Sequence, residues 1–541
     1  FVLKSILDKM IKLKNVCLSA ALATTVLTAN AGGLLTNTNQ NIAFNRMMSR
    51  EASIGIDGVY YNPAGVAFMK DGHHLSINFQ SAWQTRTIEN SYPLFAYNAN
   101  NPSANRKFKG EAFAPVIPSF QYAYNKNRWS FQGNFALAGG GGKCKFDDGL
   151  GSFEEVVANI GLLGNTLAPY LQRLLPTNPD IVNPNAAANP LYQQIGGYGY
   201  TFDSYMRGRQ YYYGLSLGAA YRINDNLSVY AGVRGIYATC NYYGYVKNIS
   251  FVGKSGAKLP LSSIVDPNDP QSSDIELNTD QTGYGFTPIL SIDYKTGRWN
   301  FSAKYEFKTH MCLKNQGTVI TPVSKLNNIG ANLMAYGVPA QVLQQVAPAI
   351  NAAKENINEL IAEYDQDQNG KDPGDIPALL TLGVGYSPID ALRINVGFHW
   401  FDDKEATSGY RYDTNQKDEN GKTIQERVDR HKKLKRGTLE YNAGIEGDVN
   451  EVLTLSAGWQ STNYGLSDAS MDDKSFVVSS NSVGCGAKVN ISKKIALNVA
   501  YFHTFYKHKK TSGANATTGL TYTADYTRNN DVVGVGLDID F

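Results

Sequence analysis

A chain of 541 residues with 43% apolar residues, 18% charged residues and a formal net charge of +3 excludes two classes of protein. The apolar content is too high for a disordered chain, and the net charge is too small for a nucleic-acid-binding surface, so we expect no nucleic-acid partner. The aromatic residues are mostly Tyr, with 34 Tyr beside 23 Phe and 5 Trp. Tyr suits strand ends that meet lipid head groups, so the composition is compatible with a membrane β-barrel.

The segment 1–31 predicts a signal peptide for export. Lys12 and Lys14 precede an apolar run from Val16 to Leu27, and Ala29-Asn30-Ala31 supplies the small-x-small pattern that a signal peptidase recognises. We therefore expect cleavage after residue 31.

The mature protein is predicted to begin at Gly32. Met10 is a better initiator than Phe1, so residues 1–9 are expected to be a mis-assigned start. Apart from the signal peptide, the sequence contains no stretch near the roughly 20 apolar residues of a membrane helix. If the protein lies in a membrane, strands must cross it.

Residues 32–72 are rich in Gly, Asn and Ala and contain no long alternating pattern. A barrel of fourteen strands would enclose a bore too wide for its own side chains to fill. We therefore expect 32–72 to form a stopper, or hatch, inside a barrel made by residues 73–541.

Fourteen segments alternate between apolar and polar or small residues, as membrane strands do. In the segment that begins at 391, for example, every second residue from Leu392 to Trp400 is apolar. The predicted strands lie near 74–88, 113–124, 128–138, 206–223, 227–246, 282–294, 298–309, 377–387, 391–402, 434–447, 452–464, 476–490, 494–507 and 527–541. The fold class is therefore all-β, a 14-stranded antiparallel transmembrane barrel.

The connections sort by length, which favours a barrel over a large soluble all-β domain. Six are short, at 125–127, 224–226, 295–297, 388–390, 448–451 and 491–493, and those between them are long. An even strand number returns both chain ends to the periplasm and places the long loops outside the cell. The last predicted strand ends at Phe541, like the C-terminal aromatic through which outer-membrane barrels are recognised by the barrel assembly machinery.

The run from Ala52 to Gly65 contains Asn62-Pro63-Ala64-Gly65 just before the first predicted strand. This run resembles the hatch of the long-chain fatty-acid transporter (FadL) family, to which toluene and xylene channels belong. The resemblance implies a 14-stranded barrel that lets hydrophobic molecules cross the outer membrane by diffusion, without energy from TonB or nucleotides. This sequence departs from the family pattern in two ways that bear on the identity of the substrate. Residues 44–48 are bulkier than the Gly-rich stretch typical of the fatty-acid members, and the outer loops are longer.

Two long loops carry apolar stripes at helical spacing. The stripes include Val156, Ile160 and Leu163 in the first loop, and Leu333, Val342 and Val346 in the second. In one interpretation the two helices pack on each other and cap the barrel. In the other, their groove captures an amphipathic ligand, as the helical loops of the resembling family do.

Strand parity turns three basic side chains, Arg234, Lys304 and His399, toward the middle of the bore, where they are candidate contacts for a ligand head group. Such charges also pair with each other to stiffen a barrel wall. Gly133 and Asn134 lie in the third strand, and a Gly in a strand can mark a kink. Since the resembling family opens sideways at a kink in its third strand, these two residues are the candidate lateral exit.

The remaining chemical motifs are weak. Four cysteines remain after the predicted cleavage, Cys144, Cys240, Cys312 and Cys485; they lack metal-ligand spacing and allow one loop disulfide at most. Residues 365–370 begin like a calcium-binding EF-hand loop, but Ile376 stands where the bidentate Glu belongs, so a solvated turn is the default interpretation. Motifs for hydrolases, nucleotide binding or cofactors are absent from the sequence, so we expect neither an enzyme nor a metal or cofactor.

The leading hypothesis is a passive outer-membrane channel for hydrophobic or amphipathic small molecules such as long-chain fatty acids. The expected partners are membrane lipid, the small-molecule ligand and the assembly machinery. The alternative is an outer-membrane barrel with an adhesin, receptor or structural role, including haem-type ligand capture. A TonB-dependent receptor is disfavoured because it needs about 22 strands and a larger plug.

Overall fold

The computed structural model describes residues 36–171, 199–253, 256–320, 325–348, 350–351, 354, 372–419, 421, 423–515 and 518–541. The predicted signal peptide, the mature start at Gly32 and the acidic turn at 365–370 lie outside the described residues.

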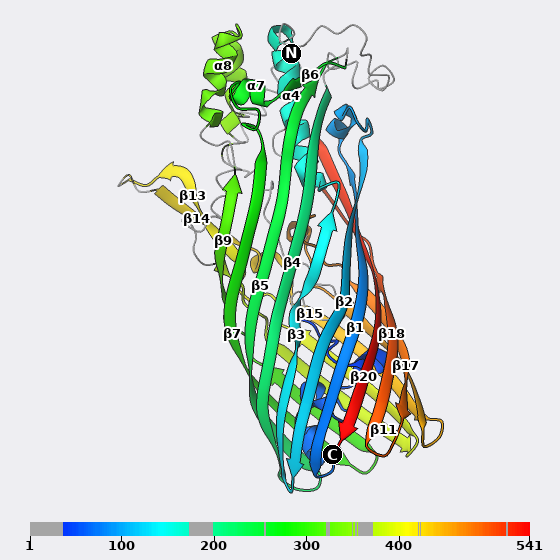
Figure 1. The fold of residues 1–541 in the computed structure, drawn as a ribbon. Helices are drawn as coiled ribbons and strands as arrows, with labels where there is room; N and C mark the ends of the chain where they lie inside the picture. The colour runs from blue at the N-terminus through cyan, green and yellow to red at the C-terminus, as the bar shows by residue number, and fades with distance from the viewer. Residues whose placement is uncertain are drawn as a thin grey trace.

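The described chain forms a closed antiparallel barrel of fourteen wall strands, which confirms the predicted fold class (Figure 1). The first and last strands, β1 and β20, pair along their length and close the wall. The wall strands are β1 (Gly72–Ser91), β2 (Asn105–Lys126), β3 (Trp129–Phe146), β4 (Gly199–Arg222), β5 (Leu227–Val252), β7 (Ile275–Thr296), β8 (Trp299–Glu306) continued by β9 (Cys312–Ile320), β11 (Leu379–Ile389), β12 (Leu392–Phe401), β15 (Thr438–Asp448), β16 (Leu453–Asn463), β17 (Ser480–Asn490), β18 (Ile495–Tyr506) continued by β19 (Lys509–Ala514), and β20 (Thr521–Asp540).

The six short connections all lie at one end of the barrel, here called the turn end, and the long loops lie at the loop end (Figure 1). Several strands run farther toward the loop end than predicted: β2 begins at Asn105, and β5 continues to Val252. Beyond the apolar surface the outward residues of β2 are charged, as at Lys107, Lys109 and Glu111, so the outward apolar pattern that marks a membrane strand ends although backbone pairing continues.

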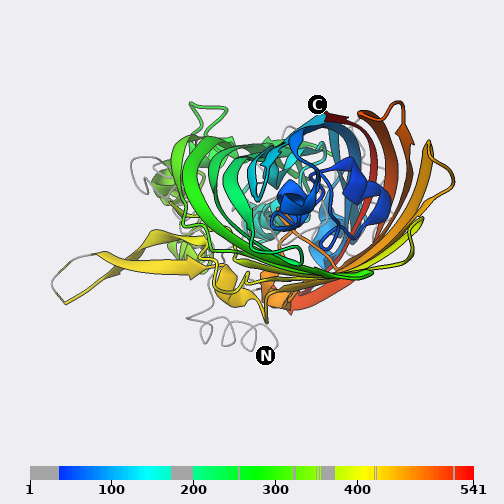
Figure 2. The same cartoon turned by 90° about the horizontal axis from the view of Figure 1, so that it is seen from below.

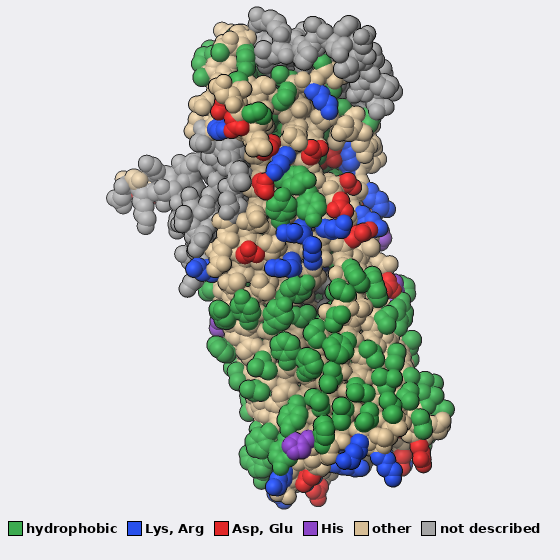
Figure 3. All heavy atoms as spheres, viewed as in Figure 1, with side chains coloured by type: hydrophobic (Ala, Val, Ile, Leu, Met, Phe, Trp, Pro, Cys, Tyr) green, Lys and Arg blue, Asp and Glu red, His purple; other side chains and the backbone are tan. Residues whose placement is uncertain are grey.

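The outer surface carries an apolar band over the part of the barrel nearer the turn end, with charged side chains on both sides of it (Figure 3). Exposed side chains of the wall include Phe79, Leu217, Leu290, Val396, Leu455 and Val533. Every second residue faces outward, as the strand patterns predicted. A wall of this kind satisfies its backbone groups by closing on itself and presents apolar side chains to lipid. Among the helices of the described residues, none combines the length and apolar character needed to cross a bilayer.

The described part of the hatch, residues 36–71, lies inside the bore near the turn end (Figure 2). It contains α2 (Ile42–Met47), α3 (Gly58–Tyr61) and the 3-10 helix η1 (Gly65–Phe68). Most of its side chains are buried, because they pack against inward-facing residues of the wall.

The long loops contain further helices and strands, most of them toward the loop end (Figure 1). They are η2 (Pro93–Tyr97), α4 (Gly151–Leu171), β6 (Lys258–Pro260), α7 (Ser262–Val265), η4 (Lys325–Asn328), α8 (Ile329–Ala335), β10 (Asp372–Pro373), the hairpin β13 (Gly409–Lys417) with β14 (Thr423–Asp429), η5 (His431–Lys433) and η6 (Asp468–Ser470). Some of these loops fold into the bore: Phe95, Phe153 and Phe476 join wall residues such as Tyr212 and Ile236 in one buried apolar cluster. The loop-end half of the bore is therefore packed with apolar side chains.

Candidate functional site

The hatch approaches the wall most closely at α2. Asn41 caps this helix by accepting a 2.7 Å hydrogen bond from Ala43, and its own amide donates to Gln121 on β2 at 2.9 Å. At Gly458 on β16, a Cβ atom would lie 1.6 Å from the carbonyl oxygen of Met47. Helix α2 can therefore lie this close to β16 only because the wall residue is a glycine.

Asn62, the first residue of the predicted hatch motif, links the hatch to the wall. Its side-chain amide donates a 2.6 Å hydrogen bond to Asp293 on β7 and a 3.3 Å bond to the backbone oxygen of Ser53. Its side-chain oxygen accepts a 3.2 Å bond from the Gly65 backbone. One Asn side chain thus closes the turn of the motif and anchors it to a strand.

The next two motif residues are held through their backbone oxygens. Pro63 accepts a 2.7 Å bond from the Gln132 amide on β3, and Ala64 accepts a 2.7 Å bond from the Ser228 hydroxyl on β5. Together with the bond from Asn62 to Asp293 on β7, these bonds attach the motif to three wall strands.

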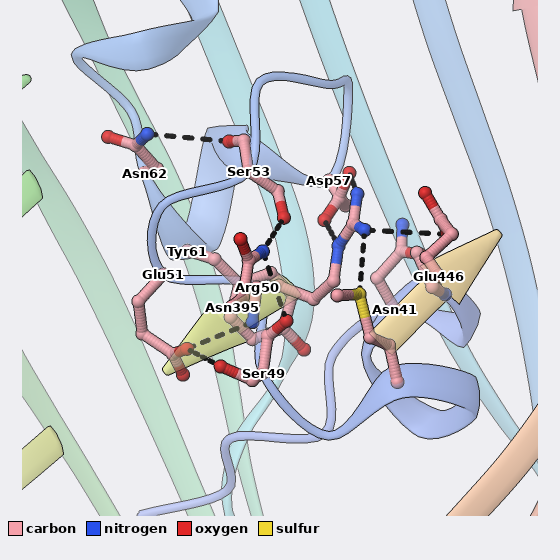
Figure 4. Close-up of polar contacts among 12 residues, drawn as sticks. Asn41, Ser49, Arg50, Glu51, Ser53, Asp57, Tyr61, Asn62, Asn395 and Glu446 are labelled. Carbon is pink, nitrogen blue, oxygen red and sulfur yellow. Dashed lines mark hydrogen bonds and ion pairs between the residues drawn. The ribbon is translucent and has the colours of Figure 1, made fainter. Parts of the chain in front are cut away.

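Ion pairs fix the other side of the hatch (Figure 4). Arg50 forms two hydrogen bonds with Asp57, at 2.7 and 3.0 Å, and lies 3.7 Å from Glu446 on β15. Arg46 pairs directly with Glu446 and donates a 3.2 Å bond to Asn498 on β18. These groups are buried, where breaking one partner of a pair is far more costly than at the surface.

His399 points into the bore, as the strand alternation predicted, and lies between two carboxylates. Its ring nitrogens are 2.9 Å from Glu51 of the hatch and 2.8 Å from Glu440 of β15. Burial opposes ionisation of Glu51, but hydrogen bonds from His399 and Ser49 outweigh it and hold the pKa of Glu51 below its usual value. The three side chains form a charged bridge between hatch and wall.

Arg234 and Lys304 share one carboxylate. Glu306 on β8 lies 2.6 Å from Arg234 and 2.7 Å from Lys304. The Lys304 ammonium also donates a 2.8 Å bond to the backbone oxygen of Tyr60 in the hatch and lies 4.2 Å from the centre of its ring. The three predicted ligand cations therefore lie at the interface between hatch and wall, each with a carboxylate, and their contact with a ligand stays a prediction.

The wall is interrupted between β2 and β3. Pairing stops between Ala112–Cys144 and Phe120–Phe135, and the register of β3 against β4 shifts twice between Leu137 and Gly142. Two causes act together: Pro115 and Pro118 of β2 have no N–H to donate, and Gly140 and Gly142 of β3 adopt positive φ angles of 88° and 70°.

The start of the described hatch covers this lateral break from the inside. The Asn37 backbone donates a 2.9 Å bond to Ala138 of β3, and its side-chain amide donates a 3.1 Å bond to Gly140. A pocket at the break is lined by Asn37 and by residues of β1 to β4, among them Gln84, Phe113 and Tyr211. On the outer side, Phe113 is 54% exposed, which places the break at the apolar surface.

The predicted lateral exit residues Gly133 and Asn134 lie closer to the turn end than the break. They pair regularly with Tyr122 and Gln121 of β2, and Asn134 donates a 3.1 Å bond to Gln40 of the hatch. A glycine whose neighbours keep ladder pairing does not kink a strand, whereas the run from Gly139 to Gly142 does. Their role in an exit remains a prediction.

The two helical loops pack on each other. Leu167 of α4, Leu333 of α8 and Val346 belong to one buried cluster, with Ile160 and Val342 packed against it. Val156 is half-buried, and the side chain of Leu163 lies outside the described residues. This arrangement agrees with the capping interpretation, while ligand capture by the same loops stays untested.

Comparisons with known proteins identify the fold. No protein-family model and no curated protein matches the sequence. The structure is similar to a Pseudomonas aeruginosa FadL homologue, with a TM-score of 0.60 and 14% identity over 94% of this chain and 100% of that one. This chain has the FadL-type barrel fold.

Two further solved structures support the same FadL-type fold. The TodX deltaS2 mutant, described as a monoaromatic hydrocarbon channel, gives a TM-score of 0.51 and 14% identity over 93% of this chain and 98% of that one. The TodX deltaS2S3 mutant gives 0.50 and 14% identity over 93% and 99%.

Sequence reasoning identified the hatch motif of this FadL-type barrel but missed the charged residues around it. Arg46, Arg50 and Glu51 have no periodic pattern to mark them, because the hatch contains little regular structure. A usable signal existed in the wall: Glu440 and Glu446 lie on the inward face of a predicted strand. Buried acids in the wall require cations. Arg46 and Arg50 of the hatch and Arg393 of β12 provide them for Glu446, and His399 of β12 provides one for Glu440.

Proposed function

We propose that this chain is an outer-membrane channel for passive uptake of hydrophobic or amphipathic small molecules, with long-chain fatty acids as the first candidates. The observation that carries the proposal is the lateral break between β2 and β3 at the apolar surface. A hydrophobic molecule that leaves through such a break enters lipid without crossing water.

The axial route supports the same interpretation. Passage straight through the bore would have to separate the Asn62–Asp293 bond, the Arg46–Glu446 pair and the Glu51 bridge. The route through the break leaves these hatch contacts in place, although the contacts of Asn37 with β3 must give way. The names of the structural neighbours, a FadL homologue and monoaromatic hydrocarbon channels, point to ligands of the same general kind.

Uptake into liposomes tests the proposal. Ala114 lines the pocket at the break, so A114W is expected to fill it and to lower the flux of a labelled long-chain fatty acid, or of toluene, at least about tenfold. A457W, which adds the same ring to an exposed alanine of β16, is the matched control and is expected to transport normally.

The outcomes separate the two candidate functions. Flux through the wild-type protein no greater than that of empty liposomes would contradict the channel, and ligand binding without flux would favour the receptor alternative. Equal flux through A114W and A457W would remove the break from the route. The relative fluxes of fatty acid and toluene indicate the preferred substrate class.

A further inference from the structure

Positive charge gathers on the outer wall where the apolar band ends. Figure 3 shows Lys and Arg side chains along the loop-end border of the band. Four of these residues form what is here called the basic patch: Lys143 and Lys145 of β3, and Arg207 and Arg209 of β4. The two lysines are exposed and the two arginines are half-buried, and all four lie on the outward face of the wall, because the residues between them are buried.

The strand register places like charges of the basic patch directly opposite each other. Lys143 pairs with Arg209, and Lys145 pairs with Arg207 in the next outward row. Cross-strand neighbours on one face have their Cβ atoms about 5 Å apart, and like charges at such positions destabilise a sheet. Four cations therefore share one small square of wall. An anion placed over this square would replace their repulsion by charge-assisted hydrogen bonds.

Two carboxylates at the edge of the basic patch are each paired with a lysine. Asp147 lies 2.9 Å from Lys145. Glu111 of β2, the cross-strand partner of Lys145, lies 2.9 Å from Lys109 of its own strand. These two acids therefore balance Lys145 and Lys109, and leave the other three cations of the patch unbalanced.

Those three cations form no ion pair within the part of the chain that the structure describes. Arg207 donates a 2.8 Å hydrogen bond to the neutral side chain of Asn241. Asn241 in turn donates a 2.9 Å bond to Asp280 of β7, which is not itself an ion-pair partner of Arg207. The Nε atom of Arg209 is buried without a hydrogen-bond partner, and no described side chain accepts a bond from Lys143. The basic patch thus keeps an excess of positive charge.

The charge is local to β3 and β4 and does not form a ring around the barrel. Following the cross-strand ladders away from the basic patch leads to neutral or acidic residues: Asn241 and Asp280 on one side, Glu111 and Thr85 on the other. General attraction to a charged membrane surface does not require cations to cluster on two strands. A cluster of this kind indicates a single bound molecule.

The basic patch lies next to the surface that contacts lipid. On β4 the outward residues continue from Arg209 through Tyr211 and Tyr213 to the exposed Leu215 and Leu217. Tyr commonly lies at the level of lipid head groups, between the apolar core of a membrane and water. In the orientation predicted from the loop lengths, this border of the band faces the outside of the cell.

We propose that the basic patch binds the phosphate groups of a glycolipid in the outer leaflet, whose acyl chains lie along the apolar wall toward the turn end. Phosphate is the anion that the planar fork of arginine matches with two hydrogen bonds, and lysine adds a point charge. Two pairs of cations suit a head group with more than one phosphate. This inference rests on the outer-membrane location in the proposed function and does not depend on which molecule is transported.

Binding of four probes to the full chain in an uncharged detergent tests the site. The probes are lipid A with two phosphates, the same lipid A with its phosphates removed, phosphatidylglycerol and inorganic pyrophosphate. We expect the wild-type protein to bind lipid A at least about tenfold more tightly than each of the other three, measured by native mass spectrometry. Pyrophosphate has the charge but lacks acyl chains, and phosphatidylglycerol has a single phosphate.

Two double variants separate the basic patch from net charge. K143Q/R209Q removes one cross-strand pair and is expected to weaken binding of lipid A at least about tenfold, with no change for the dephosphorylated lipid. K126Q/R128Q removes the same charge from exposed residues at the turn end and is expected to keep the affinity of the wild type. Equal losses in the two variants would mean that net charge alone attracts the lipid, and would overturn the site.

A stability measurement keeps the test decisive if K143Q/R209Q does not fold, which heat-modifiable gel mobility reports. The single variant K143Q relieves one repulsion, so without lipid its melting temperature is expected to be no lower than that of the wild type. Lipid A is expected to raise the melting temperature of the wild type more than that of K143Q. Equal rises in the two proteins, or wild-type affinity for any other probe equal to that for lipid A, would overturn the proposal.

Failure of this inference is distinguishable from failure of the proposed function. Toluene flux through the wild-type protein in phosphatidylcholine liposomes involves no phosphorylated glycolipid and tests the channel by itself. Flux without a preference for phosphorylated lipid A would overturn the basic patch as a lipid site alone. The same preference without flux of toluene or fatty acid would overturn the channel alone.

Discussion

The side chain of Asn62 in the hatch donates a 2.6 Å hydrogen bond to Asp293 in β7, and so joins two residues 231 positions apart in the chain. The same side chain closes the turn of the hatch motif through Gly65. Local turn chemistry and attachment to the wall therefore depend on one amide group.

Replacing Asn62 by Ala is expected to loosen the hatch, because a buried Asp293 oxygen loses one of its two donors and keeps only the bond from Asn300, at a cost of about 1–3 kcal/mol. The expected result is a higher ionic conductance in planar bilayers and a lower unfolding temperature. Asn226 lies in an exposed turn outside the hatch, so N226A serves as the control with unchanged conductance. Conductance of N62A equal to that of the wild type would show that this bond does not hold the hatch.

The close approach of α2 to β16 predicts a steric effect. In G458A the new Cβ would lie 1.6 Å from the Met47 carbonyl oxygen, so α2 must move away from the wall. G133A is the matched control, because the nearest atom, in Leu217, lies at an ordinary 3.5 Å. We expect G458A, but not G133A, to increase leakage of a small hydrophilic dye from liposomes; tight liposomes with both variants would disprove a need for glycine there.

The ion pairs predict a large difference between buried and exposed charges. E446Q leaves Arg46, Arg50 and Arg393 without their shared carboxylate and is expected to cost about 3–5 kcal/mol of stability. E89Q, at the exposed pair with Lys107, is expected to cost no more than about 1 kcal/mol. Urea titration followed by gel mobility measures both, and similar losses in the two variants would contradict the ranking.

A buried acid at the loop end predicts a pH effect. Burial, together with the neighbouring charge of Asp472, raises the pKa of Asp473 to about 7, while its carboxyl accepts hydrogen bonds from Ser152 in α4. Because the pKa is higher in the folded state than in the unfolded chain, the stability it contributes is complete below about pH 4 and is lost as the pH rises through 7.

The melting temperature of the wild-type protein is therefore expected to fall between pH 5 and pH 8.5 through this group. D473N cannot ionise at this position and is expected to show a smaller fall over the same range. Parallel pH profiles for the two proteins would mean that Asp473 does not control the docking of α4.

Much of the architecture was predictable because lipid imposes a simple rule on each strand. Outward residues such as Val396 and Leu455 must be apolar, and this repeats at every second position whatever the neighbouring strands are. The rule weakens beyond the apolar band, which is why the loop-end extensions of β2 and β5 were not predicted. The helical loops were recognised for the same reason, since a stripe such as Leu333 to Val346 reflects one buried face.

The sequence by itself determined the barrel, its fourteen strands, the loop sorting and the hatch motif, because each depends on local periodicity or on a short run of residues. Only the tertiary structure decided which charges pair across the bore. Glu51 meets His399 because barrel closure and hatch insertion bring distant segments together. The lateral break likewise depends on prolines of β2 lying beside glycines of β3, a relationship that exists only once the strands are in register.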